Sequence, residues 1–289
     1  MNRKLDALID LLDDPDLTVF ELVQNELLKE TDKIIPALEK KWETSFDGYC
    51  QERIESIIQN IQFKETERLL QEWLVTDSDR RDLLTGFLTI DRFQYPDLNP
   101  LNIQTKIENI RKKIWLELNN SLTLLEKTTI LNHFLFNIND FSINFKNIHS
   151  PQNCFLNQLL DTKKGNPVSM GIFYTIIARQ LDLPAQFIDF PKNPLVAIVD
   201  PKLARKVHGN SAKSDVLFYI NPSNKGSITS IKEIEYHLRT NNYQPIHHYT
   251  EPKSDVFFIK LLIETLGLSY HSVNFIDKKE RIHQLLQLF

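Results

Sequence analysis

Two residues in the middle of the chain have side chains that can act as nucleophiles. Cys154 follows His149 by five residues, and an imidazole beside a thiol is the pairing that cysteine hydrolases use. Ser169 stands at the expected start of a helix and offers a hydroxyl. Structural roles are the competing interpretation, because a buried cysteine behaves as a small apolar side chain and a serine at a helix start caps an N–H group. We favour those roles, since the sequence places no base beside Ser169.

The histidines do not form a pattern typical of a metal site. His247 and His248 are adjacent, so their rings point to different faces of an extended segment, with no cysteine or carboxylate in register. His133 lies at an apolar helix end, where we expect a hydrogen-bonded core residue or a brace for the loop 137–150. The two cysteines of the chain are too few for a zinc site or a disulfide framework. We therefore expect no metal and no cofactor.

Apolar residues repeat with the period of a helix through residues 1–75 and again over 101–136. The first part divides into short segments, which predicts antiparallel helices similar to HEAT hairpins, although no clean internal repeat is present. Polar and proline-rich stretches within 76–100 interrupt the pattern and leave room for one short helix at 82–92. We expect residues 1–90 to form a helical, HEAT-like N-terminal region.

Helix and strand patterns mix in the second half of the chain. Alternating or continuous apolar runs predict strands at 185–190, 195–199 and 216–220. The 3.6-residue period predicts helices at 155–160, 167–182, 231–238, 256–266 and 282–289. We expect an ordered loop at 137–150 and a solvated loop at 201–214.

These elements predict an α+β fold with three parts. The all-helical, HEAT-like region at 1–90 is followed by a helix-then-sheet core at 91–245, and a C-terminal helical segment occupies 246–289.

The composition narrows the classes of function. The 289 residues include only 7 glycines, which argues against a Gly-rich nucleotide loop. Lys and Arg number 34 against 38 Asp and Glu, which gives a net charge of -4. The chain therefore has no overall positive charge of the kind that indicates binding to nucleic acid or to an anionic membrane. No apolar run nears the roughly 20 residues that span a bilayer, and the start lacks the apolar region of a secretory signal. Few cysteines and no signal predict a cytoplasmic protein.

Several short segments follow one another in an order that resembles the transglutaminase-like family, in its bacterial SirB-type branch. They are Pro151-Gln152-Asn153-Cys154-Phe155, Lys164-Gly165-Asn166-Pro167-Val168-Ser169, Leu181-Asp182-Leu183-Pro184 and Tyr219-Ile220-Asn221-Pro222. Upstream segments such as Trp115-Leu116-Glu117-Leu118-Asn119 are similar too, so the resemblance covers most of the chain. It implies a transglutaminase-like core, in which a helix packs on an antiparallel sheet as in papain-like folds.

The resemblance also implies where catalytic residues would stand. Active members use a Cys at the start of the helix, a His on the next strand and an Asp on the one after, because a thiolate needs a base and an oriented imidazole. Here the helix starts without a thiol, at Ser169 and its neighbours, Asn193 stands where His is expected, and Asn221 stands where Asp is expected. An amide does not titrate and cannot serve as the base.

We therefore expect a vestigial cleft at Ser169, Asn193 and Asn221. The long Asn-rich loop 137–150 would lie beside it, because such loops often carry binding. The further cleft-lining candidates are His133, His149, Cys154 and Asn166.

The resulting interpretation is a catalytically inactive transglutaminase-like protein that acts as a protein-interaction or regulatory module. Its partner would be a protein that binds the helical N-terminal region. We expect it to bind neither nucleic acid nor a membrane. One alternative is a cysteine or serine hydrolase, or a transglutaminase-like enzyme, that uses unusual residues such as Ser169 or Cys154. Another is a purely structural scaffold. The enzyme would require His133 or His149 within about 3 Å of the thiol or hydroxyl.

Overall fold

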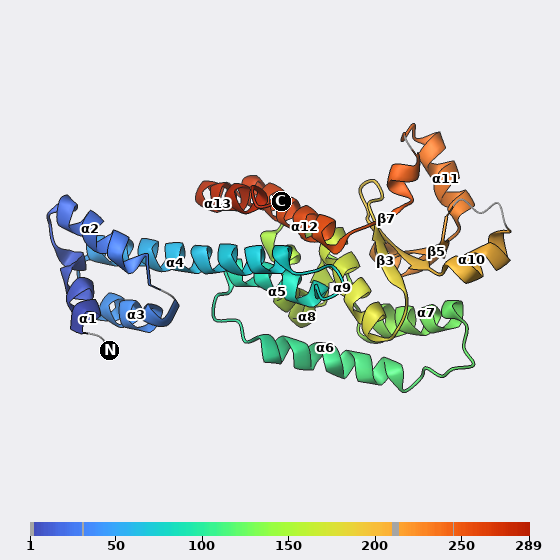
Figure 1. Ribbon diagram of the computed structural model, residues 1–289, viewed down its shortest axis with the longest axis horizontal. Coiled ribbons are helices and arrows are strands. Elements are labelled where there is room, and N and C mark those ends of the chain that lie inside the picture. Colours follow the sequence, from blue (N-terminus) through green and yellow to red (C-terminus); the bar gives the residue numbers. More distant parts are fainter. Residues whose placement is uncertain (1–2, 31, 210–213, 245) are drawn as a thin grey trace. The chain divides into compact units, whose positions relative to one another are not determined.

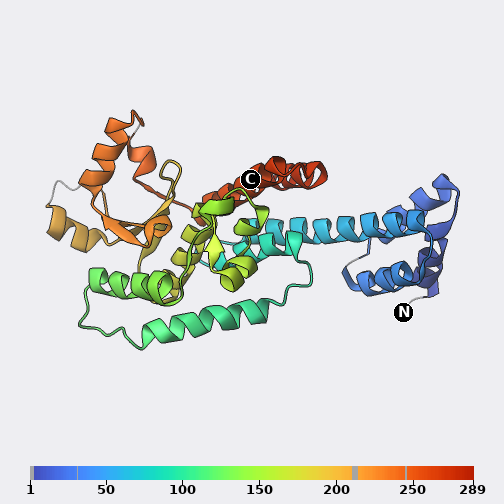
Figure 2. The same ribbon diagram turned by 180° about the vertical axis from the view of Figure 1, so that it is seen from behind.

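The computed structural model describes residues 3–30, 32–209, 214–244 and 246–289. It is an α+β protein whose chain divides into two compact units (Figures 1 and 2). The first unit runs through Asp77 and includes Arg92–Asp97, whereas the second comprises Ser78–Asp91 and Leu98–Phe289. None of the described helices has the length and apolar character needed to cross a bilayer.

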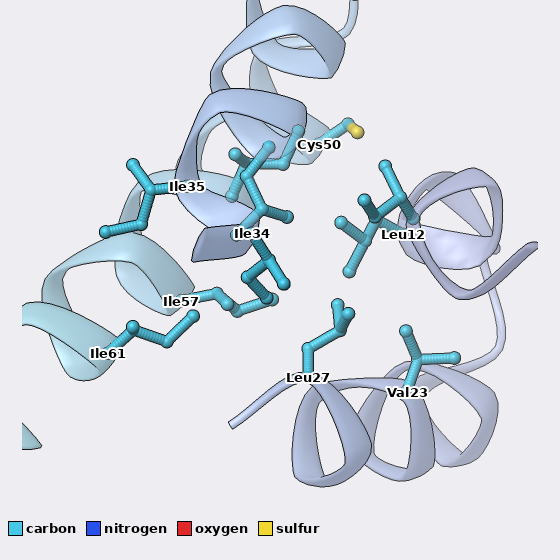
Figure 3. Packing of buried hydrophobic residues seen from close by; sticks show 11 residues of the cluster. Leu12, Val23, Leu27, Ile34, Ile35, Cys50, Ile57 and Ile61 are labelled. Carbon is cyan, nitrogen blue, oxygen red and sulfur yellow. The ribbon is translucent and has the colours of Figure 1, made fainter. Parts of the chain in front are cut away.

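The first unit is helical, as the apolar period predicted. Its helices are α1 (Arg3–Asp10), α2 (Leu17–Leu27), α3 (Ile35–Thr44) and α4 (Gly48–Val75). Their apolar faces meet in one core, in which Leu12 and Leu27 are fully buried against Ile57 and Cys50 (Figure 3). Each helix has one apolar face, so this mutual burial stabilises the unit.

The expectation of short helices alone is wrong for α4. This helix continues for 28 residues from its N-cap Asp47 to Val75. No glycine or proline interrupts the chain between Tyr49 and Val75, so nothing in the sequence ends the helix after its first turns.

The helix α5 (Leu83–Gln94) supplies one buried carboxylate to the second unit. Asp91 is fully buried and accepts hydrogen bonds from the backbone N–H groups of Leu156 (2.7 Å) and Asn157 (2.8 Å). These two donors belong to the first turn of α8 (Leu156–Thr162), where a helix has no internal acceptors for them. Asp91 therefore acts as a cap for α8 from another element.

The remaining helices before the sheet are α6 (Pro100–Trp115), α7 (Leu124–Asn132) and α9 (Pro167–Gln180). After α7 the chain continues as a π-helix at His133–Ile138 and then forms the short strand β1 (Ser142–Ile143). This strand pairs in parallel with β2 (Lys164–Gly165). The expected loop 137–150 is therefore partly regular structure, because the backbone groups of Ser142 and Asn144 pair with Lys163 and Gly165.

An antiparallel sheet of five strands forms the centre of the second unit. Its order is β6-β5-β4-β3-β7. The strands are β3 (Ala185–Ile188), β4 (Leu195–Val199), β5 (Val216–Asn221), β6 (Ser227–Thr229) and β7 (Pro252–Lys253). The strands β6 and β7 have three and two residues, too few for an alternating pattern to be visible in the sequence.

Helices cover both faces of this sheet. On one face, Phe187 contacts α9 and α12 (Asp255–Ser272), where a Cβ at Gly171 would lie 2.9 Å from its ring. On the other, Ile188 and Tyr219 pack with Ile234 of α11 (Ile231–Thr240). The helix α13 (Ile276–Leu286) follows α12. Alternate strand residues thus face opposite helices.

The predicted solvated loop at 201–214 is wrong in its first part. Residues Pro201–His208 form the helix α10 between β4 and β5. Asp200 caps its start by accepting from the N–H groups of Lys202 and Leu203, both at 2.9 Å. Pro201 suits the first turn because its missing N–H would have no acceptor there. The predicted loop residues 210–213 lie outside the described residues.

Candidate functional site

The start of α9 is a capping box in which both the backbone N–H and the hydroxyl of Ser169 are hydrogen-bonded. The backbone N–H of Ser169 donates to Oδ1 of Asn166 (2.9 Å), and the N–H of Asn166 donates to Oγ of Ser169 (3.1 Å). The Ser169 hydroxyl itself donates to the carbonyl of Asn153 (2.6 Å). Ser169 is fully buried, so its hydroxyl stabilises the helix start and faces no solvent-filled space.

Gly165 allows the chain to approach this helix start closely. A Cβ at Gly165 would lie 2.8 Å from Oγ of Ser169 and 2.9 Å from Cδ1 of Leu159. Any larger residue would therefore displace the serine from its hydrogen bonds. The backbone carbonyls of Asn153 (2.6 Å) and Asn166 (3.2 Å) both accept from the hydroxyl.

Cys154 lies in the same buried polar cluster. Its Sγ accepts a hydrogen bond from Nδ2 of Asn166 (3.0 Å). Burial raises the pKa of the thiol to about 12, although hydrogen bonds from Ser269 and Asn166 oppose this shift. Because the thiolate is the nucleophilic form, a thiol with this pKa is inert at neutral pH.

Neither histidine near this region serves as a base for these groups. His133 is exposed and not a core residue, but its Nδ1 lies 3.1 Å from Nδ2 of Asn137, so the second of the two expected roles, a contact with the loop 137–150, is the one the structure has. His149 is also exposed, and its carbonyl accepts from Ser272 (3.5 Å). Within the described parts of the chain, no hydrogen bond joins an imidazole to Cys154 or Ser169.

The two candidate amides line a pocket on the other side of the sheet. The pocket has a volume of about 500 Å³ and lies between the β3–β4 turn, the β5–β6 hairpin and α11. Asn193 belongs to the turn, where its N–H donates to the carbonyl of Pro191 (2.8 Å). Asn221 ends β5, and its Oδ1 accepts from the N–H of Ser223 (3.0 Å). Of the seven predicted site residues, only Asn193 and Asn221 line this pocket.

The helix α11 contributes two titratable residues that sequence reasoning missed. His237 lines the pocket with its ring 5.5 Å from that of Phe190. Glu233 lines it as well, but its carboxylate accepts from Ser230 N (2.7 Å), Ser230 Oγ and Thr229 Oγ1 (both 2.9 Å). These hydrogen bonds lower the pKa of the Glu233 carboxyl, and those from Ser230 have the largest effect. The Ser230–Glu233 spacing marks a helix start in the sequence, yet it does not show that the helix covers a pocket.

The pocket can bind a ligand by hydrogen bonds and stacking. Its amides donate and accept without titrating, and the lining contains no cysteine. The described residues also contain no group of three His, Cys, Asp or Glu side chains placed to hold a metal ion. A volume of this size falls within the range of small-molecule and side-chain binding sites.

A model of the transglutaminase-like superfamily matches residues 102–260. The chain belongs to the transglutaminase-like superfamily. The match covers the region from α6 to the first turns of α12, and the α9 helix packed on the antiparallel sheet is the transglutaminase-like core. The site residues Cys154 to Asn221 all lie within this core.

Two groups of relatives are similar to parts of the chain. A UPF0162 protein of Xylella fastidiosa is 28% identical over 122 residues, which are 42% of this chain and 43% of that protein. F-box only protein 21 of Mus musculus and of Homo sapiens is 24% identical over 241 residues, which are 76% of this chain and 36% of theirs. The chain thus spans less than half the length of these relatives. No solved structure matches it.

Proposed function

We propose that this transglutaminase-like protein is catalytically inactive and acts as a protein-interaction or regulatory module. The proposal rests on the burial and hydrogen bonding of the two potential nucleophiles. The Ser169 hydroxyl is committed to the Asn153 carbonyl, and the Cys154 thiol is buried with a raised pKa. A covalent mechanism needs an accessible nucleophile beside a base, and these two groups lack both.

In this proposal Ser169, Asn193 and Asn221 stand, in sequence order, at the triad positions of the SirB-type branch, but they do not form one constellation, because Ser169 lies at the start of α9 and the two amides lie across the sheet from it. Two of them line one pocket, which supports a retained binding cleft. The third is buried at the helix start, which supports the loss of chemistry from it. The similarity to a UPF0162 protein supports a bacterial branch of this kind.

We propose that the helical region at 1–90 is the partner surface, with the core at 91–245 and the helical segment at 246–289 as the other parts. Large apolar side chains are exposed on the first unit, among them Phe46, whose side chain is fully exposed, and Tyr49 and Leu22. Exposed apolar groups of this size are typical of protein-binding surfaces. The F-box only protein 21 relatives contain a similar region within longer chains, which supports a role as a module. Both cysteines are free and buried, which supports a reducing, cytoplasmic location.

The enzymatic half of the proposal is tested by an amine-incorporation assay with a glutamine-containing protein and by ester hydrolysis. We expect rates equal to the uncatalysed background for the native chain and for the matched variants Cys154→Ala and Ser169→Ala. An active transglutaminase serves as the positive control. A rate above background that either variant abolishes would overturn the proposal.

The interaction half is tested by affinity capture with the full chain and with the double variant Leu22→Ser/Phe46→Ser. Both side chains are exposed and lie outside the buried cluster of the first unit, so the variant keeps the helical core intact. We expect a protein that the native chain retains and the variant loses. Capture of nothing above control by the full chain and by residues 1–90 would contradict this part.

A further inference from the structure

The helix α10 displays cationic and aliphatic side chains together. Lys202, Arg205 and Lys206 are exposed along one side of it. At about 100° per residue, these three side chains lie within an arc of roughly 100°. In the same helix Leu203 is 38% exposed and Val207 is 68% exposed.

The orientation of α10 is fixed by its buried side. Ala204 is fully buried, and the helix packs near β5. The helical period places Leu203 and Val207 between Ala204 and the cations, so they border the buried side and remain open to solvent. In Figures 1 and 2, α10 lies at the outer end of the sheet, away from α12. The cations and the aliphatic residues therefore form one continuous outward surface.

The three cations have no ion-pair partner among the described residues. By comparison, Lys41 is paired with Asp13 (3.3 Å) and Lys106 is paired with Asp161. The nearest carboxylate in sequence, that of Asp200, accepts from two backbone N–H groups at the helix start. The eight residues of α10 thus carry a formal charge of +3 from Lys202, Arg205 and Lys206, in a chain whose net charge is -4.

We propose that this surface of α10, formed by Lys202, Leu203, Arg205, Lys206 and Val207, binds an acidic segment of a partner protein. In that segment, Asp or Glu side chains would pair with the three cations. Aliphatic side chains spaced three or four residues apart would cover Leu203 and Val207. Charge complementarity selects the partner and speeds association, and the aliphatic contact adds buried apolar area.

A membrane or a nucleic acid fits this surface less well. Only two aliphatic side chains and no aromatic one face outward, whereas interfacial helices use Trp, Phe and Leu to enter the lipid boundary. Single-stranded nucleic acid is bound by stacking on aromatic side chains, which α10 lacks. The exposed Asp215 adds negative charge near the start of α10, since its carbonyl accepts from the N–H of Asp200 (3.0 Å). A wide anionic surface would come close to this carboxylate and be repelled, whereas a narrow peptide can bind without approaching it.

The test uses the full chain and a short fluorescein-labelled peptide with Leu every third or fourth residue among glutamates. Fluorescence anisotropy should show saturable binding that weakens as salt is added. We expect Arg205→Glu/Lys206→Glu to weaken binding by about tenfold or more. The matched control Lys112→Glu/Lys113→Glu makes the same charge change on α6 and should bind within about twofold of the native chain. Val207→Ser, at the more exposed of the two aliphatic side chains, should also weaken binding without changing the thermal melt.

Three results would overturn the proposal. One is equal binding of the native chain and Arg205→Glu/Lys206→Glu. Another is equal binding of a peptide in which Gln replaces every Glu. The last is an absence of peptide binding, whether or not phosphatidylserine vesicles or a DNA duplex bind through α10. Each of these results leaves the proposed loss of catalysis untouched, so the two proposals fail separately.

Discussion

The side chains that could have been nucleophiles belong to a buried polar framework at the start of α9. Asn153 stands at its centre, because its carbonyl accepts from the Ser169 hydroxyl and its Nδ2 donates to the carbonyls of Asn147 (2.7 Å) and Ile148 (3.2 Å). Buried polar groups that are fully paired specify one local structure. The framework therefore accounts for these residues without a catalytic role.

Replacing Ser169 by Ala should lower the free energy of unfolding by about 1–2 kcal/mol, because the Asn153 carbonyl and the Asn166 N–H each lose their hydrogen bond to the hydroxyl and keep only the longer one between them (3.3 Å). Urea denaturation measures the change. The matched control is Ser223→Ala, since the buried Oγ of Ser223 has no hydrogen-bond partner in the described structure and its loss should cost little. A Ser169→Ala protein as stable as the native one would contradict this account.

Asp91 makes stability depend on pH. Burial raises its pKa from 3.8 to about 7, while hydrogen bonds from Asn157 and Leu156 oppose the shift. The folded protein therefore holds this proton more tightly than the unfolded chain, so the stabilisation from Asp91 is present at acidic pH and is lost as pH rises towards about 7. The free energy of unfolding of the native chain minus that of Asp91→Asn should fall between pH 4 and pH 8. A flat or rising difference would show that Asp91 is ionised throughout this range.

The residue types of the candidate site were easier to predict from the sequence than the positions of the side chains. The amides at 193 and 221 could be recognised from the sequence, and they line one pocket. The exposure of His133 could not, because the apolar neighbours at 131 and 135 suggested a buried helix end. A π-helix begins at this histidine and widens the turn, which changes the direction of the side chains that follow.

At the scale of elements, the β5–β6 turn is fixed to α7 and α9 by one asparagine. Nδ2 of Asn132 donates to the carbonyl of Gly226 (2.7 Å), and its Oδ1 accepts from the hydroxyl of Tyr174 (2.8 Å). Tyr174 is fully buried, and burial raises the pKa of its hydroxyl. This link holds the hairpin that carries Asn221 against the core helix.

Gly226→Ala should break this link. Gly226 has a φ of +72°, and a Cβ there would lie 2.4 Å from Cγ of Asn132, so the asparagine must move. We expect a loss of at least about 2 kcal/mol of stability, measured by chemical denaturation. Gly209→Ala is the control, because Gly209 also has a positive φ (+82°) but nothing within 4 Å of its Cβ position. Equal losses in the two variants would mean that backbone strain alone acts and that the Asn132 contact contributes nothing.

Long periodic elements could be predicted from the sequence, whereas elements defined by tertiary pairing could not. The strands at 195–199 and 216–220 have continuous apolar runs and appear where the pattern placed them. Among the residues of α10 whose burial is described (201–207), Ala204 alone is buried, so the charged sequence looked like a loop. The strands β1 and β2 have two residues each and exist only because they pair with one another.

At the scale of the whole molecule, the second unit should fold without the first. Residues 78–289 contain all of its segments, including Asp91, which caps α8. We expect this fragment to melt cooperatively in circular dichroism. The fragment 92–289 lacks most of α5 and the carboxylate that accepts from Leu156 and Asn157, so it should melt at a lower temperature. Equal melting of the two fragments would contradict the role of α5 in the core.

The central proposal is that neither Cys154 nor Ser169 is a reactive nucleophile in the transglutaminase-like core. The most direct measurement is intact-mass spectrometry of the native full chain after exposure to iodoacetamide and, separately, to a fluorophosphonate. We predict no stoichiometric modification of Cys154 or Ser169 in the folded protein, and alkylation of both Cys50 and Cys154 once urea unfolds it. Rapid, single-site labelling of Cys154 or Ser169 under native conditions would contradict the claim.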